Sequence, residues 1–142
     1  MADDHKNQQA TVIPTLRYRD GAAAIEWLCA AFGLEKQLVV PDKDGAVAHA
    51  QLIYGNGMIM LGASTNNEFH ELVKSPLESG GVGSQSAYVR VSDIDAHYER
   101  AVAAGAEVVI EIKTEEHGGR SYSCRDIEGH IWNFGSYDPW AA

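Results

Sequence analysis

The sequence predicts an α+β fold in which the order strand, helix, strand, strand, strand occurs twice. Three observations support this prediction. A strand-like segment precedes each of two helix-like stripes of apolar residues, and three strand-like segments separated by turn-forming residues follow each stripe. The two halves also repeat one another at a nearly constant spacing. A chain of 142 residues can bury an ordinary core without disulfides.

The first predicted module covers residues 11–62 and follows a polar segment, 1–10, that we expect to be a disordered tail. Its first strand is 11–18, and Asp20 is a suitable N-cap for a helix that ends before Gly33. The apolar stripe of this helix consists of Ile25, Leu28, Cys29 and Phe32. The three strands that follow are predicted at 35–40, 46–54 and 58–62.

The second predicted module covers residues 85–136 and follows a polar, glycine-rich stretch, 63–84, that we interpret as a linker. Ser92 or Asp93 is expected to cap its helix, which ends before Gly105. The apolar stripe of that helix is Tyr98, Ala101 and Val102. The strands are predicted at 85–91, 106–113, 120–125 and 131–135, and residues 137–142 form an aromatic tail.

Matching residues in the two halves indicate an internal repeat. The same offset of 73 in the numbering relates three pairs: Arg17 and Arg90, Asp20 and Asp93, and Gly62 and Gly135. For the glycines that end the two helices, Gly33 and Gly105, the offset is 72, and we expect a loop to absorb the difference. We infer that the chain contains two copies of one βαβββ module.

Strand periodicity predicts which side chains face a cleft between the two modules. Each helix covers one face of its sheet, and the two uncovered faces are expected to close into an incomplete barrel with a cleft. In the first module the cleft-facing residues are Ile13, Thr15, Arg17, His49, Gln51, Met58 and Met60. With an offset of 73 applied throughout, their partners are Ser86, Tyr88, Arg90, Tyr122, Cys124, Ile131 and Asn133.

This pattern resembles the vicinal oxygen chelate superfamily, which includes glyoxalase I, extradiol dioxygenases and bleomycin-binding resistance proteins. The segments that carry the resemblance are IPTLRYRDGAAAIEWLCAAFGLEK, AHAQLIYGNGMIMLG, VRVSDIDAHYERAVAAGAEV and GGRSYSCRDIEGHIWNFGSYDPW. The RDIEGH stretch is similar to the Asp-Pro-Asp-Gly turn of the superfamily, with Ile127 in place of proline. The resemblance implies the glyoxalase/bleomycin resistance fold.

The resemblance also implies where metal ligands would lie, namely in the first and last strand of each module. Here those four positions are occupied by Ile13, Met60, Ser86 and Asn133. Isoleucine and methionine side chains do not suit a hard divalent cation, and a Ser–Asn pair is too weak to hold one alone. We therefore expect no metal and no cofactor, and no metal-dependent isomerase or dioxygenase chemistry.

Of the six histidines, His49 alone is expected to face the cleft, as a hydrogen-bonding group more often than as a metal ligand. His97 is expected on an exposed helix face. Arg17 and Arg90 could each hold an anionic ligand or instead pair with an acid at the rim of the cleft.

The leading hypothesis is metal-independent binding of a small organic molecule, cationic ligands included, similar to the bleomycin resistance branch. The residues expected to contact the ligand are Thr15, Arg17, His49, Gln51, Met60, Tyr88, Arg90, Tyr122, Ile131, Asn133 and Trp140. The alternative is a glyoxalase-like lyase or isomerase that uses acid–base chemistry, with His49 as the base and Tyr122 as the acid, or non-standard metal chemistry. A protein-interaction module without a ligand is a third hypothesis.

Charge and hydropathy limit the partners. A formal net charge of −9 argues against nucleic acid. The polar N-terminus and the lack of a long apolar run predict a cytoplasmic protein that does not bind membranes. Exposed sheet edges predict a homodimer, with Tyr137, Pro139 and Trp140 at or near its interface.

Overall fold

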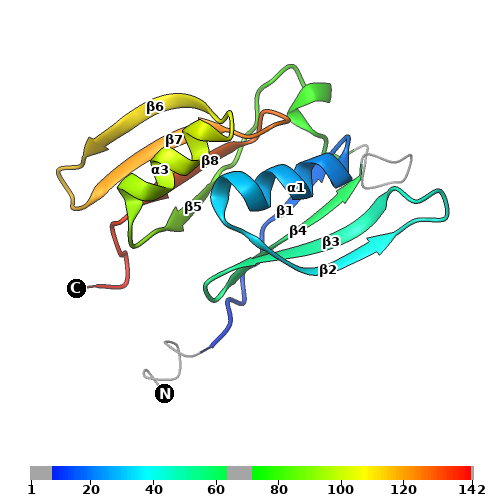
Figure 1. Cartoon of the computed structure of the whole chain (residues 1–142), viewed down its shortest axis with the longest axis horizontal. Coiled ribbons are helices and arrows are strands. Elements are labelled where there is room, and N and C mark those ends of the chain that lie inside the picture. The colour runs from blue at the N-terminus through cyan, green and yellow to red at the C-terminus, as the bar shows by residue number, and fades with distance from the viewer. Residues whose placement is uncertain (1–7, 64–71, 142) are drawn as a thin grey trace. The chain divides into compact units, whose positions relative to one another are not determined.

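The computed structural model describes residues 8–63 and 72–141. The chain divides into two compact units: unit 1 comprises Met1–Cys29 and Gly33–Ser75, and unit 2 comprises Ala30–Phe32 and Pro76–Ala142. The elements occur twice in the order strand, helix, strand, strand, strand, and they form two separate four-stranded sheets (Figure 1). The predicted α+β fold of two βαβββ modules is confirmed. The expected tail lies mostly outside the described residues, as does the part of the linker from 64 to 71.

Unit 1 has the sheet order β1-β4-β3-β2, in which β1 and β4 are parallel and the other pairs antiparallel. Its elements are β1 (Thr15–Tyr18), α1 (Gly21–Phe32), β2 (Glu35–Pro41), β3 (Val47–Tyr54) and β4 (Gly57–Ala63). Residues 8–10, which were expected in the tail, approach the β3–β4 turn: Ala10 donates its N–H to the carbonyl of Asn56, and Asn56 donates to the carbonyl of Gln8.

Helix α1 begins and ends as its sequence predicts. The carboxylate of Asp20 accepts the N–H of Ala23 at 3.1 Å, and Gly33 adopts a left-handed φ of 78° that ends the helix. A Cβ on Gly21 would stand 3.0 Å from the Cβ of Val47 and 3.7 Å from a methyl of Leu61. The start of α1 therefore packs closely on the face of the sheet that carries these two side chains.

Unit 2 has the sheet order β5-β8-β7-β6, with β5 and β8 parallel. Its elements are the 3-10 helix η2 (Pro76–Glu78), β5 (Ala87–Arg90), α3 (Ile94–Ala103), β6 (Glu107–Thr114), β7 (Arg120–Arg125) and β8 (Ile131–Gly135). Asp93 caps α3 by accepting the N–H of Ala96 at 3.2 Å, and α3 lies against the sheet (Figure 1).

The core of unit 2 contains an aromatic cluster that includes a histidine. His97 was expected on an exposed face, but only 7% of it is exposed. Its ring centroid lies 4.3 Å from that of Phe134, beside Phe32 at 6.1 Å. Val102 was expected in the apolar stripe of α3 but is 46% exposed, and the buried residues of the helix are Ile94, His97 and Ala101.

Hydrogen bonds determine which ring nitrogen of His97 carries a proton. Its Nε2 lies 3.0 Å from the carbonyl oxygen of Phe32, which can only accept a hydrogen bond. Nε2 therefore donates, and Nδ1 accepts from the hydroxyl of Tyr122 at 2.7 Å. Burial lowers the pKa of His97.

The expected cleft position of Tyr122 is wrong, and the reason lies in the spacing of the repeat. Tyr122 is 1% exposed and contacts His97 and Tyr98 of α3, so it faces the helix. Cys124 is likewise fully buried. The residues that alternate with Tyr122 and Cys124 along the strand face away from the helix. The predicted alignment of this strand was off by one residue, and such a slip exchanges the two faces of a strand.

Strand pairing shows where the spacing changes. Gln51 pairs with Met60, and Ser123 pairs with Asn133, so the offset in the numbering is 72 between β3 and β7 but 73 between β4 and β8. The β7–β8 turn is one residue longer than the β3–β4 turn, since Arg125 pairs with Ile131 whereas Ile53 pairs with Met58. The counterparts of His49 and Gln51 are therefore Ser121 and Ser123.

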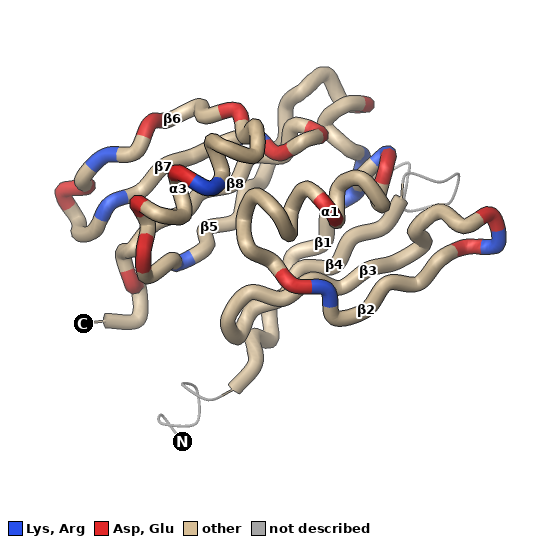
Figure 2. Tube along the Cα trace, viewed as in Figure 1, with Lys and Arg blue, Asp and Glu red and all other residues tan. Residues whose placement is uncertain are grey.

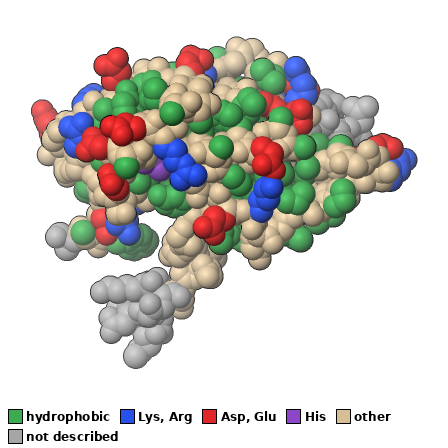
Figure 3. Space-filling model, in the orientation of Figure 1, with side chains coloured by type: hydrophobic (Ala, Val, Ile, Leu, Met, Phe, Trp, Pro, Cys, Tyr) green, Lys and Arg blue, Asp and Glu red, His purple; other side chains and the backbone are tan. Residues whose placement is uncertain are grey.

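The charged residues of both units lie mainly at turns, strand ends and helix surfaces, with both signs interspersed (Figure 2). Hydrophobic side chains lie among charged ones on the face that Figure 3 shows. In the part of the chain that the structure describes, no helix is long and apolar enough to cross a membrane.

Candidate functional site

The sheet of each unit has a face opposite to its helix, and we call it the helix-free face. In β3, Ala50 and Leu52 are fully buried on the side of α1, and His49 and Gln51 alternate with them on the helix-free face. The imidazole Nε2 of His49 lies 2.8 Å from the side-chain oxygen of Gln51. Both side chains are half-buried. The structure thus brings these two predicted site residues together.

Arg17 lies on the same face, over the end of β4. One guanidinium nitrogen donates to the carbonyl of Ala63 at 2.6 Å, and another lies 2.7 Å from where a Cβ would stand on Gly62. Glycine at position 62 therefore leaves the room that the guanidinium occupies. Thr15 pairs with Met60 across the β1–β4 ladder, so these two predicted residues also share a face.

Asn133 occupies the centre of the helix-free face of unit 2, and both polar atoms of its side-chain amide have hydrogen-bond partners within the unit. The amide nitrogen donates to the hydroxyl of Ser86 at 2.8 Å and to the carbonyl of Ala87 at 3.0 Å. The amide oxygen accepts from the hydroxyl of Ser123 at 2.7 Å. Both donors and the oxygen of Asn133 thus have partners in its own unit.

Tyr88 and Arg90 of β5 are tied to the segment that follows β8. The hydroxyl of Tyr88 donates to the carbonyl of Tyr137 at 2.7 Å, and Arg90 lies 4.0 Å from the carboxylate of Asp138. Burial raises the pKa of Tyr88, although 42% of the residue remains exposed. Trp140 is 91% exposed, and its expected stacking on a ligand remains a prediction.

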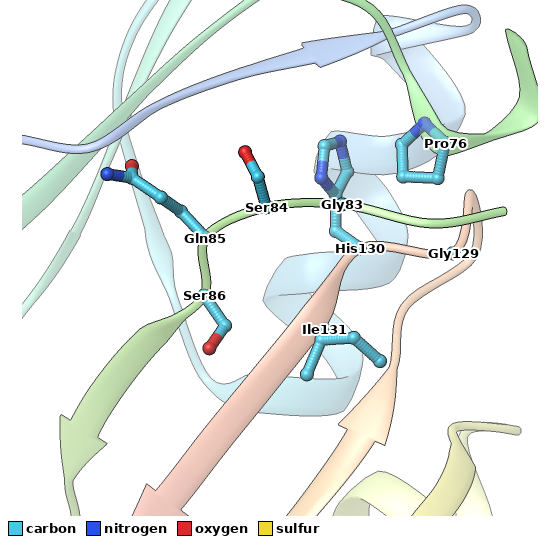
Figure 4. Close-up of a pocket in the computed structure, with 8 residues that line it drawn as sticks. All are labelled: Pro76, Gly83, Ser84, Gln85, Ser86, Gly129, His130 and Ile131. Atoms are coloured by element: carbon cyan, nitrogen blue, oxygen red, sulfur yellow. The ribbon is translucent and has the colours of Figure 1, made fainter. Parts of the chain in front are cut away.

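A pocket of about 290 Å³ opens at the end of the unit 2 sheet where β8 begins. It is lined by Pro76, Gly83, Ser84, Gln85, Ser86, Gly129, His130 and Ile131 (Figure 4). Hydroxyl, amide and imidazole groups supply its polarity, and no Lys, Arg, Asp or Glu is among these lining residues. The pocket therefore suits an uncharged group that forms hydrogen bonds.

Sequence reasoning predicted one of these pocket residues, Ile131, as a ligand contact and Ser86 as a cleft residue. Ser84, Gln85 and His130 were missed because they lie in segments interpreted as a linker, as the first residue of a strand and as a turn. The signal that could have found them is the dense run of small polar residues directly before β5.

The four positions at which the resemblance places metal ligands do not suit a hard divalent cation. Ile13 has no donor atom, and Met60 has only a thioether sulfur. The hydroxyl of Ser86 accepts from the amide nitrogen of Asn133, and the amide oxygen of Asn133 accepts from the hydroxyl of Ser123. Among the residues that the structure describes, no three or more His, Cys, Asp or Glu side chains form a group that could hold a metal ion.

Comparison with known sequences places the chain in a family. Residues 11–134 match the model of the Glyoxalase/Bleomycin resistance protein/Dioxygenase superfamily. The chain belongs to this superfamily. Two proteins similar to this chain are uncharacterized proteins of Mycobacterium bovis and Mycobacterium tuberculosis, each 30% identical over 129 residues. The matches cover 91% of this chain and 84% and 75% of the two relatives.

Several solved structures share the fold of this chain. TioX from Micromonospora sp. ML1 is 32% identical with a TM-score of 0.70, over 89% of this chain and 97% of its own. Lactoylglutathione lyase from Agrobacterium tumefaciens is 21% identical with a TM-score of 0.65, over 94% and 98%. A glyoxalase/bleomycin resistance protein from Streptomyces sp. CB03234 is 16% identical with a TM-score of 0.66, over 89% and 99%. These last two show the fold alone.

Proposed function

We propose that this superfamily member binds a small organic molecule on its helix-free sheet faces, without a metal at the four superfamily positions. The observation that carries the proposal is the state of Asn133. Its amide oxygen, the one atom of this side chain that could bind a cation, already accepts from Ser123, while the amide nitrogen donates to Ser86 and Ala87. A cation at this position would therefore compete with the hydroxyl of Ser123 for that oxygen. At the two superfamily positions of unit 1, Ile13 has only hydrocarbon and Met60 has only a thioether sulfur.

The composition of the two faces supports binding rather than metal-assisted chemistry. Met58 and Met60 are flexible and polarizable, so they can adapt to a flat organic surface. The unit 2 pocket supplies uncharged hydrogen-bonding groups, and polar groups of this kind orient ligands in mostly apolar sites. No bond of the ligand needs to break in this proposal.

Metal analysis tests the first half of the proposal. We expect the purified chain, incubated with Zn²⁺, Ni²⁺, Mn²⁺ or Fe²⁺ and then desalted, to retain far less than one ion per chain. The matched control carries I13H, M60Q, S86H and N133E, which restore ligand types suited to these cations. Stoichiometric metal in the unmodified chain, accompanied by lyase or isomerase turnover, would favour the enzyme hypothesis instead.

Thermal denaturation with small molecules tests the second half. We expect berberine, a planar cation, to raise the Tm in a dose-dependent manner. It should do so more than the anion 1-anilinonaphthalene-8-sulfonate, since the chain carries a net charge of −9. Met60→Arg should abolish the shift, whereas Val102→Arg, the same charge change on the exposed surface of α3, should preserve it. Equal loss in both variants, or no shift by either probe, would contradict the proposal.

We also propose that the chain forms a homodimer. Strand β2 is an edge of its sheet, every residue of it is exposed, and three consecutive apolar residues, Leu38, Val39 and Val40, lie along it. Sedimentation at tens of micromolar protein should give a dimer, and a monomer there would contradict the proposal. Removal of residues 137–142 should weaken association if the tail takes part, and an unchanged dimer would exclude only that part.

A further inference from the structure

A hydrogen-bonded row of three polar side chains crosses the helix-free face of unit 1. His49 lies 2.8 Å from the side-chain oxygen of Gln51, and the amide nitrogen of Gln51 donates to the side-chain oxygen of Gln37 at 2.6 Å. This row of side chains runs from β3 to the edge strand β2. Leu38 and Val40 flank it, because they pair with Gln51 and His49.

Two β-bulges place these side chains. Lys36 pairs with Leu52 and Leu38 pairs with Gln51, so Gln37 is the extra residue of a bulge in β2. A second bulge leaves Ala48, next to His49, as the extra residue of β3. Bulges re-aim side chains and recur beside functional sites. The strand pairing therefore brings Gln37 within reach of Gln51.

The second module has an equivalent bulge but no such row of polar side chains. There Val109 is the extra residue of β6, and Ser121 and Ser123 stand where unit 1 has His49 and Gln51. The two serine hydroxyls donate to Glu115 and Asn133. The two modules thus share the bulge but not the polar residues, which are a particular property of unit 1.

The direction of the hydrogen bonds determines the tautomer of His49. Because Gln51 donates its amide nitrogen to Gln37, its oxygen points at His49, and an amide oxygen can only accept. The proton of the neutral imidazole must then be on Nε2. This leaves the lone pair of Nδ1 as an acceptor, and the imidazole of His49 makes no other hydrogen bond to the residues that the structure describes.

We propose that Gln51 and Gln37 are positioning residues that hold His49 in its Nε2–H form, so that Nδ1 accepts a hydrogen bond from an O–H or N–H group of the bound molecule. This inference rests on the proposed binding function and specifies the ligand class: a molecule that presents a hydroxyl, a phenol or an amide N–H to His49. An ether or a tertiary amide of the same shape lacks the donor and gains nothing from Nδ1.

Nitrogen-15 NMR of the histidine rings in the full chain tests the positioning role without any ligand. At pH 8 we expect His49 in the Nε2–H form. Gln51→Leu should lower the ratio of the two tautomers by about fivefold, which is what loss of a hydrogen bond of about 1 kcal/mol corresponds to. Gln37→Leu should lower it less, and Gln51→Glu should preserve it because a carboxylate still accepts from Nε2. His97, whose tautomer depends on Phe32 and Tyr122, is the internal control. An unchanged ratio in both leucine variants would overturn the positioning role.

A pair of matched probes tests the acceptor role. Titration with p-cresol should move the Nδ1 resonance of His49, and 4-methylanisole, which lacks the O–H, should not. Equal effects of the two probes, or binding of both with no response at Nδ1, would overturn the inference while leaving the binding function intact. No response of any resonance to either probe would contradict the binding function and the acceptor role together, with the tautomer result unaffected.

Discussion

The hydroxyl oxygen of Tyr88 lies 2.6 Å from the point at which a Cβ atom would stand on Gly135. Two ring carbons of Tyr88 lie 2.9 and 3.1 Å from the same point. The ring has little freedom to move away, since its hydroxyl is bonded to the carbonyl of Tyr137. In unit 1 the guanidinium of Arg17 lies over Gly62 in the corresponding place. Each sheet therefore uses a glycine of its last strand to seat a large side chain.

The first prediction concerns these two glycines. We expect Gly135→Ala to lower the free energy of unfolding by about 1–3 kcal/mol, because the new methyl group displaces the ring of Tyr88. Gly62→Ala should cost less, since the clashing atom there is the far end of a flexible side chain. Urea denaturation measures both. Gly83→Ala, with nothing closer than 3.9 Å to the new atom, is the control.

If the clash with Tyr88 is the cause, Tyr88→Ala should remove most of the additional cost of Gly135→Ala in a double-mutant cycle. Strictly additive effects of the two substitutions would argue against it.

The second prediction concerns the pH dependence of stability. Burial lowers the pKa of His97 below its ordinary value of 6.5, so below that pH the unfolded chain binds a proton that the folded chain resists. Stability should therefore fall as the pH decreases through and below 6.5. Denaturation curves between pH 8 and pH 5 measure this loss. His97→Gln, which keeps a donor and an acceptor but does not titrate, should flatten the dependence, and an equal slope in the variant would assign the loss to other groups.

The third prediction concerns the turn between β7 and β8. The carboxylate of Asp126 accepts the N–H groups of Glu128 and His130 at 3.0 Å through one oxygen, and the indole N–H of Trp132 at 3.0 Å through the other. In Asp126→Asn the amide nitrogen cannot accept, so either the buried indole or the turn loses its partner. We expect a cost of about 1–3 kcal/mol in the free energy of unfolding. Glu107→Gln, which removes an exposed ion pair with Arg125, should cost under about 1 kcal/mol.

The fourth prediction concerns the two cysteines, neither of which forms a disulfide in the part of the chain that the structure describes. Burial, with a smaller contribution from Asp126, raises the pKa of Cys124 to about 12, and the side chain is fully buried. At pH 8 only roughly one in ten thousand such thiols is ionised, so iodoacetamide should leave Cys124 unmodified in the folded chain. Mass spectrometry of the peptides after labelling measures this. In 8 M urea Cys29 and Cys124 should react equally, and rapid labelling of Cys124 without urea would contradict the burial.

The fold could be predicted from local signals because several of them agree. Asp20 and Asp93 cap their helices, Gly33 ends α1 in the left-handed region, and one offset of 73 in the numbering joins corresponding strands at both ends of the module. Periodicity also placed His49 and Gln51 on the helix-free face of unit 1.

The wrong faces predicted for Tyr122 and Cys124 come from one length difference. The helix segment from Asp93 to Gly105 is one residue shorter than that from Asp20 to Gly33, and the offset stays at 72 until the β7–β8 turn. The changed offset between Gly33 and Gly105 was visible in the sequence, but its persistence through β7 was not. His97 was misplaced because its burial depends on partners distant in the chain, Phe32 and Tyr122.

The longer β7–β8 turn has a consequence for recombining the two halves of the chain. A crossover placed inside β3 and β7 must align Gln51 with Ser123, whereas one placed in β4 and β8 must align Met60 with Asn133. In a hybrid spliced at a single uniform offset, the strand taken from β3 or β7 would have its two faces exchanged. Its polar side chains would then be buried beneath the helix. Shuffled libraries of this scaffold therefore need junctions outside the segment between the helix end and that turn, or a hairpin transferred whole together with its own turn.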